Sequence, residues 1–508
     1  MESNRTGSCR GRSACCSLFS IFLFLLTAGP LAALPLLLGD LDGDNQPTIL
    51  DLVRLIGHVN GVSPLGSGLQ PYGDINEDGL INQADLDLLQ NAILGLASLP
   101  NPYAAPVVSA PVTATNGSSI VVTGVSRPNR QILIQGGEST VWAVSDGNGR
   151  FTATVPLQIN RLNNLFLTAS NSTFTSGIPQ PLPILQDSEP PHLFIDFPSA
   201  GQTLATSNTV VAGRVGDMLS GFRGLGVYVR SSPSEDANPN LPISAAGVQF
   251  AALAKDPPPG GSPYVFNGKP ASVNVGIGNN GTFERLVPLA PGTNTLVVLA
   301  VDALGNYTFR TNTVIRQDPT PDQPRLIVLS GDRQATSIHR RLPTPIAVQL
   351  TTGAGAPLAN QAVLFNVTRS DGRLLPVDGT LPVNPSAVAN DITRTFNGVM
   401  SIQLLTDNNG VAQAWWAMGG DAGYGNNRVC VTSVGLSNNV YFCASANPAP
   451  AHQINIGSGN NQKGETGGPA AEPLRAWVND GCNGIAGLPV TFRVVQGGGK
   501  LLAPGQTG

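Results

Sequence analysis

The sequence predicts a mainly-β chain of tandem β-sandwiches preceded by one small α-helical module. Two observations favour the sandwiches: glycine (59) and proline (42) are frequent among the 508 residues, and aromatic residues make up only 6%. This composition is typical of many short strands joined by turns. A third observation, helical spacing of apolar residues in an acidic segment at 39–96, predicts the module. The length allows about three to five domains, and the 41% hydrophobic content is sufficient to give them cores.

The N-terminus is predicted to be a secretory signal peptide over residues 1–33. Three arginines precede the apolar run 18–28, as in a positively charged region followed by a hydrophobic one. A membrane anchor is the alternative, because the apolar character continues to residue 38. Pro30 and Pro35 argue against one continuous spanning helix. We therefore expect a secreted protein, extracellular or at the cell surface, with no membrane span after signal removal.

Charge is distributed unevenly along the chain. The net charge is only −4 and no long basic run occurs, which argues against nucleic acid as a partner. Residues 39–96 alone hold nine acids and one base, Arg54, a local charge of −8. Carboxylates at this density repel one another unless cations compensate their charge.

The acidic segment is an internal duplication. Residues 39–61 and 73–95 repeat each other at an offset of 34 residues, in their acids, their apolar positions and their closing glycine. The matching pairs include Gly39 and Gly73, Asp40 and Asp74, Asp44 and Asp78, Asp51 and Asp85, Leu55 and Leu89, and Gly61 and Gly95.

Each copy has the spacing of a twelve-residue calcium loop. Oxygen donors at positions 1, 3, 5, 9 and 12, with the backbone carbonyl of position 7, converge on one hard cation, and oxygen-only donors favour calcium. Position 6, where such a loop turns sharply, is Asn45 in the first copy and Gly79 in the second. Asp/Asn-rich turns and helix caps are the alternative interpretation. The predicted ligands of two calcium ions are Asp40, Asp42, Asp44, Gln46, Thr48 and Asp51, and Asp74, Asn76, Asp78, Leu80, Asn82 and Asp85.

Two such loops, each followed by a short helix, resemble a dockerin domain over residues 39–97. The resemblance implies that each repeat is a calcium loop plus a helix, and that the pair docks onto a cohesin-like domain of another protein. It also implies that positions 10 and 11 of each loop contact the partner, here Ile49 and Leu50 in the first copy and Gln83 and Ala84 in the second.

The remaining chain is predicted to form four β domains behind a linker that begins near residue 101. Proline-rich joints at 179–191, 319–324 and 447–452 separate short β-rich runs. Residues 149–171 parallel 281–306, which resembles bacterial Ig-like domains. Residues 326–334 parallel 454–462 at an offset of about 128, which resembles the invasin/intimin-type Ig repeat. The predicted domains are 105–187, 190–317, 322–447 and 452–508, the last a truncated invasin-type repeat because the chain stops inside it.

Three cysteines follow the signal segment. Cys430 and Cys443 flank a segment that reads as two strands around a turn, so a cross-strand disulfide is our hypothesis, and two unpaired thiols are the alternative. Cys482 has no visible partner.

No catalytic motif is present in the sequence. The four histidines are scattered, and no nucleophile motif or phosphate loop occurs. We expect a non-catalytic docking protein with Ig-like spacers or adhesive modules, whose partner is a cohesin-like domain. Polysaccharide and the cell surface are further candidate partners. The alternatives are a bacterial surface adhesin, and the N-terminal part of a polysaccharide-degrading enzyme whose catalytic domain lies beyond residue 508.

Overall fold

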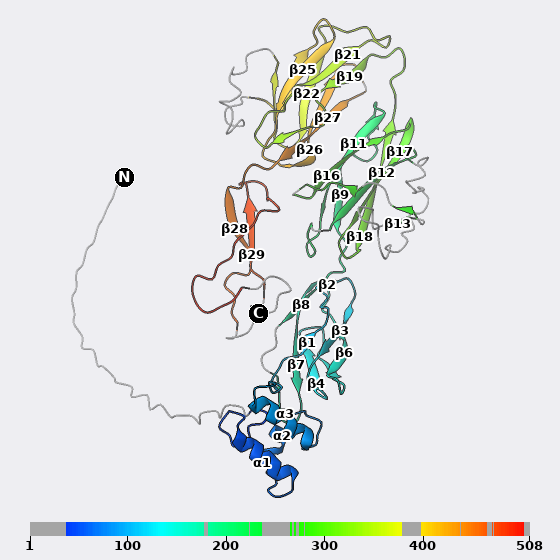
Figure 1. Ribbon diagram of the computed structural model, residues 1–508. Helices are drawn as coiled ribbons and strands as arrows, with labels where there is room; N and C mark the ends of the chain where they lie inside the picture. Colours follow the sequence, from blue (N-terminus) through cyan, green and yellow to red (C-terminus); the bar gives the residue numbers. More distant parts are fainter. Residues whose placement is uncertain are drawn as a thin grey trace, which may run out of the picture. The chain divides into compact units, whose positions relative to one another are not determined.

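The computed structural model describes the chain in two compact units, Met1–Pro102 and Tyr103–Gly508, and each is described by itself (Figure 1). Within them it describes residues 37–176, 181–222, 224–235, 265–266, 269–270, 274–278, 280–377, 398–436, 438–464, 470 and 472–501. The predicted signal peptide, residues 1–33, lies outside this part of the chain. Among the described residues, no helix has the length and apolar character needed to span a membrane.

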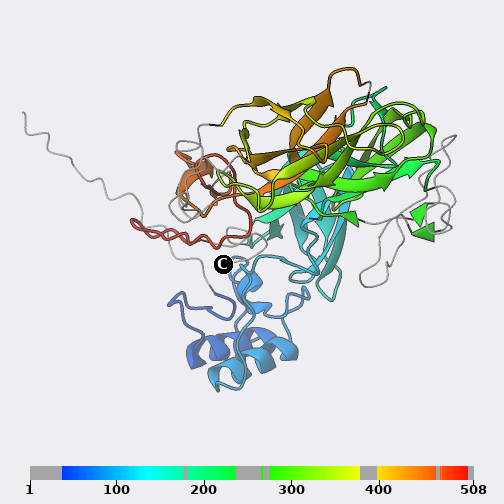
Figure 2. The ribbon, with the colours of Figure 1, turned by 90° about the horizontal axis from the view of Figure 1, so that it is seen from above.

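The first unit contains three helices, drawn in blue in Figures 1 and 2. They are α1 (Ile49–Val59), α2 (Gln70–Gly73) and α3 (Gln83–Ile93). Helices α1 and α3 contact each other, and Leu55 and Leu89, equivalent in the two copies, are fully buried between them. The buried core of this unit consists of Leu41, Leu55, Leu65, Ile75, Leu86 and Leu89.

The second unit begins with a sandwich of two sheets. One sheet has the order β1-β3-β6 and the other the order β2-β8-β7-β4-β5. Alternating side chains of β3 and β6 are buried, as expected for strands with one face on a core. The strands are β1 (Val107–Val108), β2 (Ala114–Thr115), β3 (Ser119–Val125), β4 (Gln131–Gln135), β5 (Val141–Val144), β6 (Arg150–Pro156), β7 (Arg161–Ser170) and β8 (Leu182–Gln186).

A second sandwich follows, with sheets β16-β11-β9 and β10-β18-β17-β12-β15. Among the described residues, strands β13 and β14 pair only with each other. The strands are β9 (His192–Phe197), β10 (Thr203–Leu204), β11 (Asn208–Gly216), β12 (Gly226–Ser232), β13 (Val265–Phe266), β14 (Lys269–Pro270), β15 (Asn274–Val275), β16 (Thr282–Pro288), β17 (Gly292–Val301) and β18 (Tyr307–Arg316).

A third sandwich has sheets β19-β21-β25-β23 and β20-β27-β26-β22-β24. Trp416 is fully buried in its core, while its neighbour Trp415 lies under the Arg341 guanidinium, 3.8 Å from the ring centroid. The strands are β19 (Arg325–Ser330), β20 (Gln334–Ser337), β21 (Ile346–Thr351), β22 (Ala362–Arg369), β23 (Arg373–Pro376), β24 (Ser401–Leu405), β25 (Val411–Ala417), β26 (Gly423–Ser433) and β27 (Val440–Asn447).

The three sandwiches share one topological feature. In each, a short strand near the start pairs in parallel with the last strand: β2 with β8, β10 with β18 and β20 with β27. Every other strand pair within the sandwiches is antiparallel among the residues described. The predicted fold class, Ig-like sandwiches preceded by a small helical module, is confirmed.

The parallel between the first two sandwiches extends to their packing. Phe151 of β6 and Phe283 of β16 are both buried. Each ring lies against a glycine of the neighbouring strand, Gly124 for Phe151 and Gly213 for Phe283. A Cβ at these glycines would lie 2.6 Å and 2.5 Å from the ring, so only glycine fits without displacement.

The third sandwich and the segment after it also share local structure. Strands β28 (Gln453–Ser458) and β29 (Arg475–Asn479) form a two-stranded sheet. The Gln334 side chain donates to the Thr344 carbonyl oxygen (2.9 Å) and accepts from its NH (2.8 Å). Gln462 makes the same two bonds with Glu472, at 2.8 Å and 2.6 Å. The same pair of side-chain-to-backbone hydrogen bonds therefore recurs 128 residues later, at Gln334 and at Gln462.

The hypothesis of a disulfide between Cys430 and Cys443 is wrong, because both thiols are free. The two cysteines lie on adjacent strands, β26 and β27, but not opposite each other. Cys430 faces Tyr441 and Cys443 faces Arg428. Such diagonal neighbours lie about 7–8 Å apart, beyond the separation that a disulfide spans. The alternative of two unpaired thiols therefore describes this pair.

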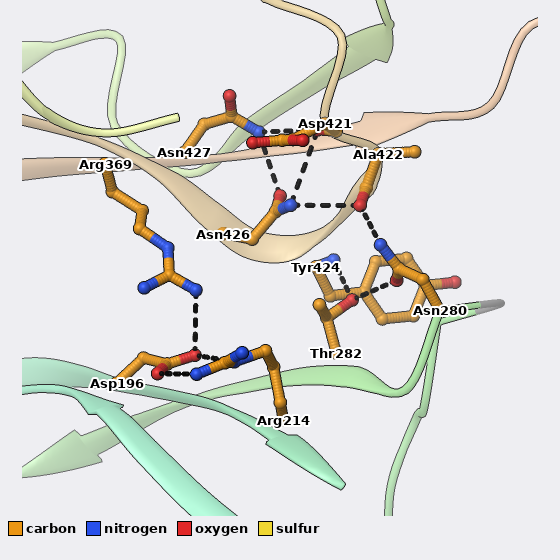
Figure 3. A network of polar contacts seen from close by, with 10 residues as sticks. All are labelled: Asp196, Arg214, Asn280, Thr282, Arg369, Asp421, Ala422, Tyr424, Asn426 and Asn427. Carbon is orange, nitrogen blue, oxygen red and sulfur yellow. Dashed lines mark hydrogen bonds and ion pairs between the residues drawn. The ribbon is translucent and has the colours of Figure 1, made fainter. Parts of the chain in front are cut away.

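The second and third sandwiches share a polar interface, shown in Figure 3. Arg369 of β22 pairs with Asp196 of β9 at 3.2 Å, and Asp196 also pairs with Arg214 of β11 at 2.8 Å. Nearby, the Tyr424 NH donates to the Thr282 hydroxyl at 2.7 Å. The Asn280 side chain donates to the Ala422 carbonyl oxygen.

Apolar side chains accompany these polar contacts. Phe197 of β9 stacks at a tilt against Tyr441, with ring centroids 5.0 Å apart. The Arg428 guanidinium lies over the other sandwich's Phe197 ring, 4.0 Å from its centroid. Cys443 is buried in the same cluster. The two sandwiches are therefore joined by packing as well as by the chain.

Candidate calcium-binding and docking module

The first acidic loop brings its carboxylates together. One oxygen each of Asp40, Asp42 and Asp44 lies within 4.8 Å of the others. Asp40 is fully buried, and its two oxygens accept the NH groups of Gly43 (2.7 Å) and Asn45 (3.0 Å). The loop therefore curls around its first carboxylate.

The second acidic loop repeats this geometry around Asp74. The Asp74 Oδ2 atom accepts the NH of Gly79 at 2.9 Å, as Asp40 Oδ2 accepts the NH of Asn45. Its Oδ1 atom accepts the NH of Asp78 at 3.0 Å. The bond to position 6 is thus duplicated, whereas the second bond comes from position 4 in the first loop and from position 5 in the second.

The last acid of each loop ties the loop to its helix. Asp51 Oδ1 accepts the NH groups of Leu41 (2.7 Å) and Asp42 (3.0 Å). Its Oδ2 accepts the NH of Thr48 at 2.8 Å. Asp85 makes the same three bonds one repeat later, with Ile75, Asn76 and Asn82 at 2.8, 3.1 and 2.9 Å.

Position 9 of each loop is a helix N-cap. The Thr48 side chain accepts the NH of Leu50, and the Asn82 side chain accepts the NH of Ala84, each within a capping box. The cap interpretation left open by the sequence is thus correct for these residues. It leaves the ligand interpretation intact, because position 9 of a calcium loop often binds through water.

Left-handed backbone conformations recur at two positions of each loop. Position 6 has φ 64° at Asn45 and φ 90° at Gly79, as its predicted sharp turn requires. Position 4 is also left-handed, with φ 86° at Gly43 and φ 61° at Glu77. The second feature was missed, although Gly43 in the first copy was its signal.

The electrostatics of the loops favour a bound cation. Burial raises the pKa of Asp74 above its ordinary value of 3.8, and the charges of Asp85 and Asp78 raise it further. The backbone NH groups of Gly79 and Asp78 oppose that rise. A donor set of carboxylate and amide oxygens fits calcium, which would replace this repulsion with attraction.

The outer surfaces of the two copies differ. On α1, Ile49, Leu50 and Val53 are 66%, 61% and 61% exposed. At the equivalent positions of α3, Gln83 and Ala84 are exposed, and the Gln83 side chain donates to Asp87 at 2.8 Å. The first copy therefore presents an apolar face, and the second presents a polar one.

Residues 38–94 match the dockerin type I domain family. This segment is a dockerin type I domain. Dockerin type I domains bind calcium in general, and the Asp-rich loop at 40–44 of this dockerin fits that property. Dockerin domains also bind cohesins in general.

Searches with the whole chain found weaker similarities. No curated protein matches. Among solved structures, the fibronectin(III)-like modules of CbhA from Clostridium thermocellum are 12% identical, cover 42% of this chain and 94% of theirs, and give a TM-score of 0.23. The adhesin FdeC of Escherichia coli is 11% identical over 68% of this chain and 98% of its own, with a TM-score of 0.23. A solved part of a 1.5-MDa bacterial ice-binding adhesin is 15% identical over 68% of this chain and 98% of its own, with a TM-score of 0.24. Scores this low support no argument about function.

Proposed function

We propose that this chain is a secreted, non-catalytic docking protein. Its dockerin binds two calcium ions and a cohesin-like partner, and its Ig-like sandwiches act as spacers or adhesive modules at a distance from the anchor. The observation that carries the proposal is the match of residues 38–94 to the dockerin family. The proposed secretion rests on the signal segment at 1–33 of the sequence.

Two calcium ions are proposed because both copies offer the same set of donors. The proposed ligands are the twelve residues predicted from the sequence. Bound calcium would supply the positive charge that a segment of local charge −8 otherwise lacks. The chain's own contribution is the fixed loop geometry, in which Asp51 and Asp85 hold each loop to the start of its helix.

The docking face is proposed to be α1. Exposed apolar side chains there have no structural use within the dockerin, and apolar anchors contribute most of the binding energy at interfaces. Ile49 and Val53 are four residues apart on one face, and Ile56, 40% exposed, continues it. Because α3 presents Gln83 and Ala84 instead, a symmetric second binding mode is not expected.

The Ig-like region is proposed to act as a row of spacers or adhesive modules. The interface around Asp196 and Phe197 supports a stiff connection between the second and third sandwiches. The same stiffness favours a second candidate function, a surface adhesin in which the sandwiches themselves bind and the dockerin only anchors them.

The test is binding of the mature chain to each cohesin domain encoded by the source organism, measured by surface plasmon resonance. We expect binding in calcium and none in EGTA. Leu50→Asp should weaken binding by about 2 kcal/mol, or roughly 30-fold. Val62→Asp is the matched control, since Val62 is 82% exposed just past α1.

Two outcomes would contradict the proposal. If no cohesin binds the calcium-loaded chain, the docking function is wrong. If Leu50→Asp binds as the parent does while Gln83→Glu fails to bind, the docking face lies on α3 and not on α1.

A further inference from the structure

A second group of carboxylates lies at the start of the second sandwich, outside the dockerin. Asp187 belongs to the segment that joins β8 to β9, Asp217 follows β11, and Asp302 follows β17. One oxygen of each lies within 4.8 Å of the others. Two oxygens bound to one calcium ion lie at most about 5 Å apart, so this spacing is compatible with a shared ion.

The buried state of this group requires an explanation. Asp187 and Asp302 are both 0% exposed. Asp187 Oδ1 accepts the NH of Glu189 at 3.1 Å, but the buried Oδ2 has no hydrogen-bond partner among the residues described. A buried carboxylate oxygen without a partner destabilises the fold. It therefore points to a ligand that supplies the missing interaction.

A further oxygen lies beside this carboxylate. The Ser220 hydroxyl is buried close enough to lower the pKa of Asp187, but it makes no hydrogen bond of normal geometry among the residues described. Burial raises the pKa of Asp187, the charges of Asp217 and Asp302 add to the rise, and the NH of Glu189 and the nearby Ser220 hydroxyl oppose it. No described Lys or Arg forms an ion pair with Asp187 or Asp217.

Two other hairpins of the chain show that turn geometry does not account for this arrangement. Asp302 Oδ1 accepts the NH groups two and four residues ahead, at 2.8 Å and 2.9 Å. Asp146 and Asp407 make the same pair of bonds in their own hairpins, at 2.9 and 2.8 Å and at 2.8 and 2.8 Å. Both of these aspartates are exposed. The hairpin turn therefore accounts for the presence of an aspartate at position 302. It does not account for the burial of that aspartate beside Asp187 and Asp217.

Hydrogen bonds also connect the first and second sandwiches beside this carboxylate group. The Asn306 side chain donates both to Asp302 Oδ2 and to the Asp187 carbonyl oxygen, each at 2.8 Å. The Asn116 side chain, which follows β2 of the first sandwich, donates to the Leu304 carbonyl oxygen at 2.9 Å. A ligand bound here would therefore act on the connection between the first and second sandwiches.

We propose that Asp187, Asp217 and Asp302 bind one calcium ion, with the Ser220 hydroxyl as an additional oxygen, and that the ion stabilises this connection. The donors are all oxygens, which excludes a preference for zinc or copper. They come from three separate loops, and calcium tolerates the irregular geometry that such loops provide better than magnesium does. This site is independent of the two in the dockerin.

The test counts ions on the mature chain after equilibrium dialysis against calcium. Asp40→Ala and Asp74→Ala are introduced first, to disable the dockerin loops. We expect the double variant to retain one calcium ion per chain, and Asp187→Asn to abolish it. Asp407→Asn, which alters an equivalent exposed hairpin, should retain it. The proposal is overturned if the double variant binds no calcium, or if Asp187→Asn leaves the ion count unchanged.

Thermal unfolding provides a second measurement that does not depend on ion counting. Calcium should raise the melting temperature of the β unit in the parent chain and have no effect in Asp187→Asn. In EGTA, Asp187→Asn should melt at or above the parent's temperature, because it removes repulsion among buried carboxylates. A lower melting temperature in EGTA with the calcium shift preserved would show a purely structural aspartate. A magnesium shift equal to that of calcium would overturn the choice of ion.

Discussion

The dockerin loop at 40–44 and the carboxylate group at Asp187 have similar chemistry but differ in how the chain assembles them. In the first, three acids occupy alternate positions of one loop, and the backbone of that loop holds them. In the second, Asp187, Asp217 and Asp302 come from three loops that only the folded sandwich brings together. The first site is therefore visible in the sequence, and the second becomes visible only in the structure.

The difference also bears on stability. The dockerin loops are part of a unit whose buried core consists of six side chains, so the loops and the helices must form together. The Asp187 group lies on a sandwich with its own large core, in which fifteen buried residues already cluster. Loss of the first site should unfold its unit, whereas loss of the second should only weaken a connection.

The largest expected effect is that of Asp51→Ala. This change leaves three backbone NH groups of the first loop without their acceptor, two of them bonded to one oxygen. We expect a loss of about 3 kcal/mol or more in the free energy of unfolding of the dockerin. Far-ultraviolet circular dichroism at 222 nm would follow it, because the described helices all belong to this unit.

Asp87→Ala is the control for this change. Asp87 is exposed on α3 and accepts only the Gln83 side chain among the bonds described. A change of less than about 0.5 kcal/mol is expected there. If the two variants lost the same free energy of unfolding, the hydrogen bonds of Asp51 to the loop would not be a specific source of stability.

Calcium removal should separate the two sites in a single experiment. Titration with EGTA is expected to abolish the helical signal at 222 nm, because the repulsion of a −8 segment is then uncompensated. The same titration should only lower the melting temperature of the β unit. If the helical signal survives in excess EGTA, the dockerin folds without its ions, and the comparison between the two sites fails.

Glu284 is a half-buried carboxylate outside both groups, and like Asp187 it has one bonded oxygen and one buried oxygen without a hydrogen-bond partner among the residues described. Its Oε1 accepts the Ser445 hydroxyl at 3.0 Å across the interface of the second and third sandwiches. Burial raises the pKa of Glu284 above 4.5, the Ser445 hydroxyl and Arg333 oppose the rise, and Asp332 adds to it.

Because the pKa of Glu284 is higher in the folded state, its contribution favours folding at low pH. That contribution is lost as the pH rises from about 4.5 through the folded pKa. Glu284→Gln should therefore reduce the decline of the melting temperature between roughly pH 4 and 8. Glu138→Gln, at an exposed position, should not. Parallel pH profiles of the two variants would refute this account of Glu284.

The smallest expected effect is that of a reducing agent. Dithiothreitol should leave the melting temperature unchanged, because Cys430 and Cys443 are not bridged. Burial raises the pKa of Cys443 to about 12, so this thiol should react with a maleimide only after unfolding. The exposed Cys482 should react at once. A melting temperature that falls on reduction would restore the disulfide.

These cases show where sequence reasoning succeeded and where it failed. The dockerin was recognisable because its acids, its left-handed position 6 and its apolar spacing all lie within twelve to twenty neighbouring residues. The sandwiches were recognisable from alternation and from repeats such as Phe151 and Phe283. Proximity in sequence misled at Cys430 and Cys443, where the register of β26 and β27 places each thiol opposite another residue.

Two features were beyond the reach of the sequence. The sequence could not show that Asp302 is buried while Asp146 and Asp407 are exposed, since all three hairpins carry the same turn signal. It could not show the interface around Phe197 either, because that contact depends on how two complete sandwiches pack. Both follow from contacts across long stretches of chain, which local patterns do not encode.

The parallel edge strands have a mechanical consequence. In each sandwich the short strand near the start runs alongside the last strand in the same direction, as β10 does with β18. A force that pulled the two ends of one sandwich apart would slide these two strands past each other. All of their hydrogen bonds would then bear the load together, instead of opening one after another. A sandwich built in this way should resist a force applied between its two ends more strongly than one whose terminal strands separate one hydrogen bond at a time.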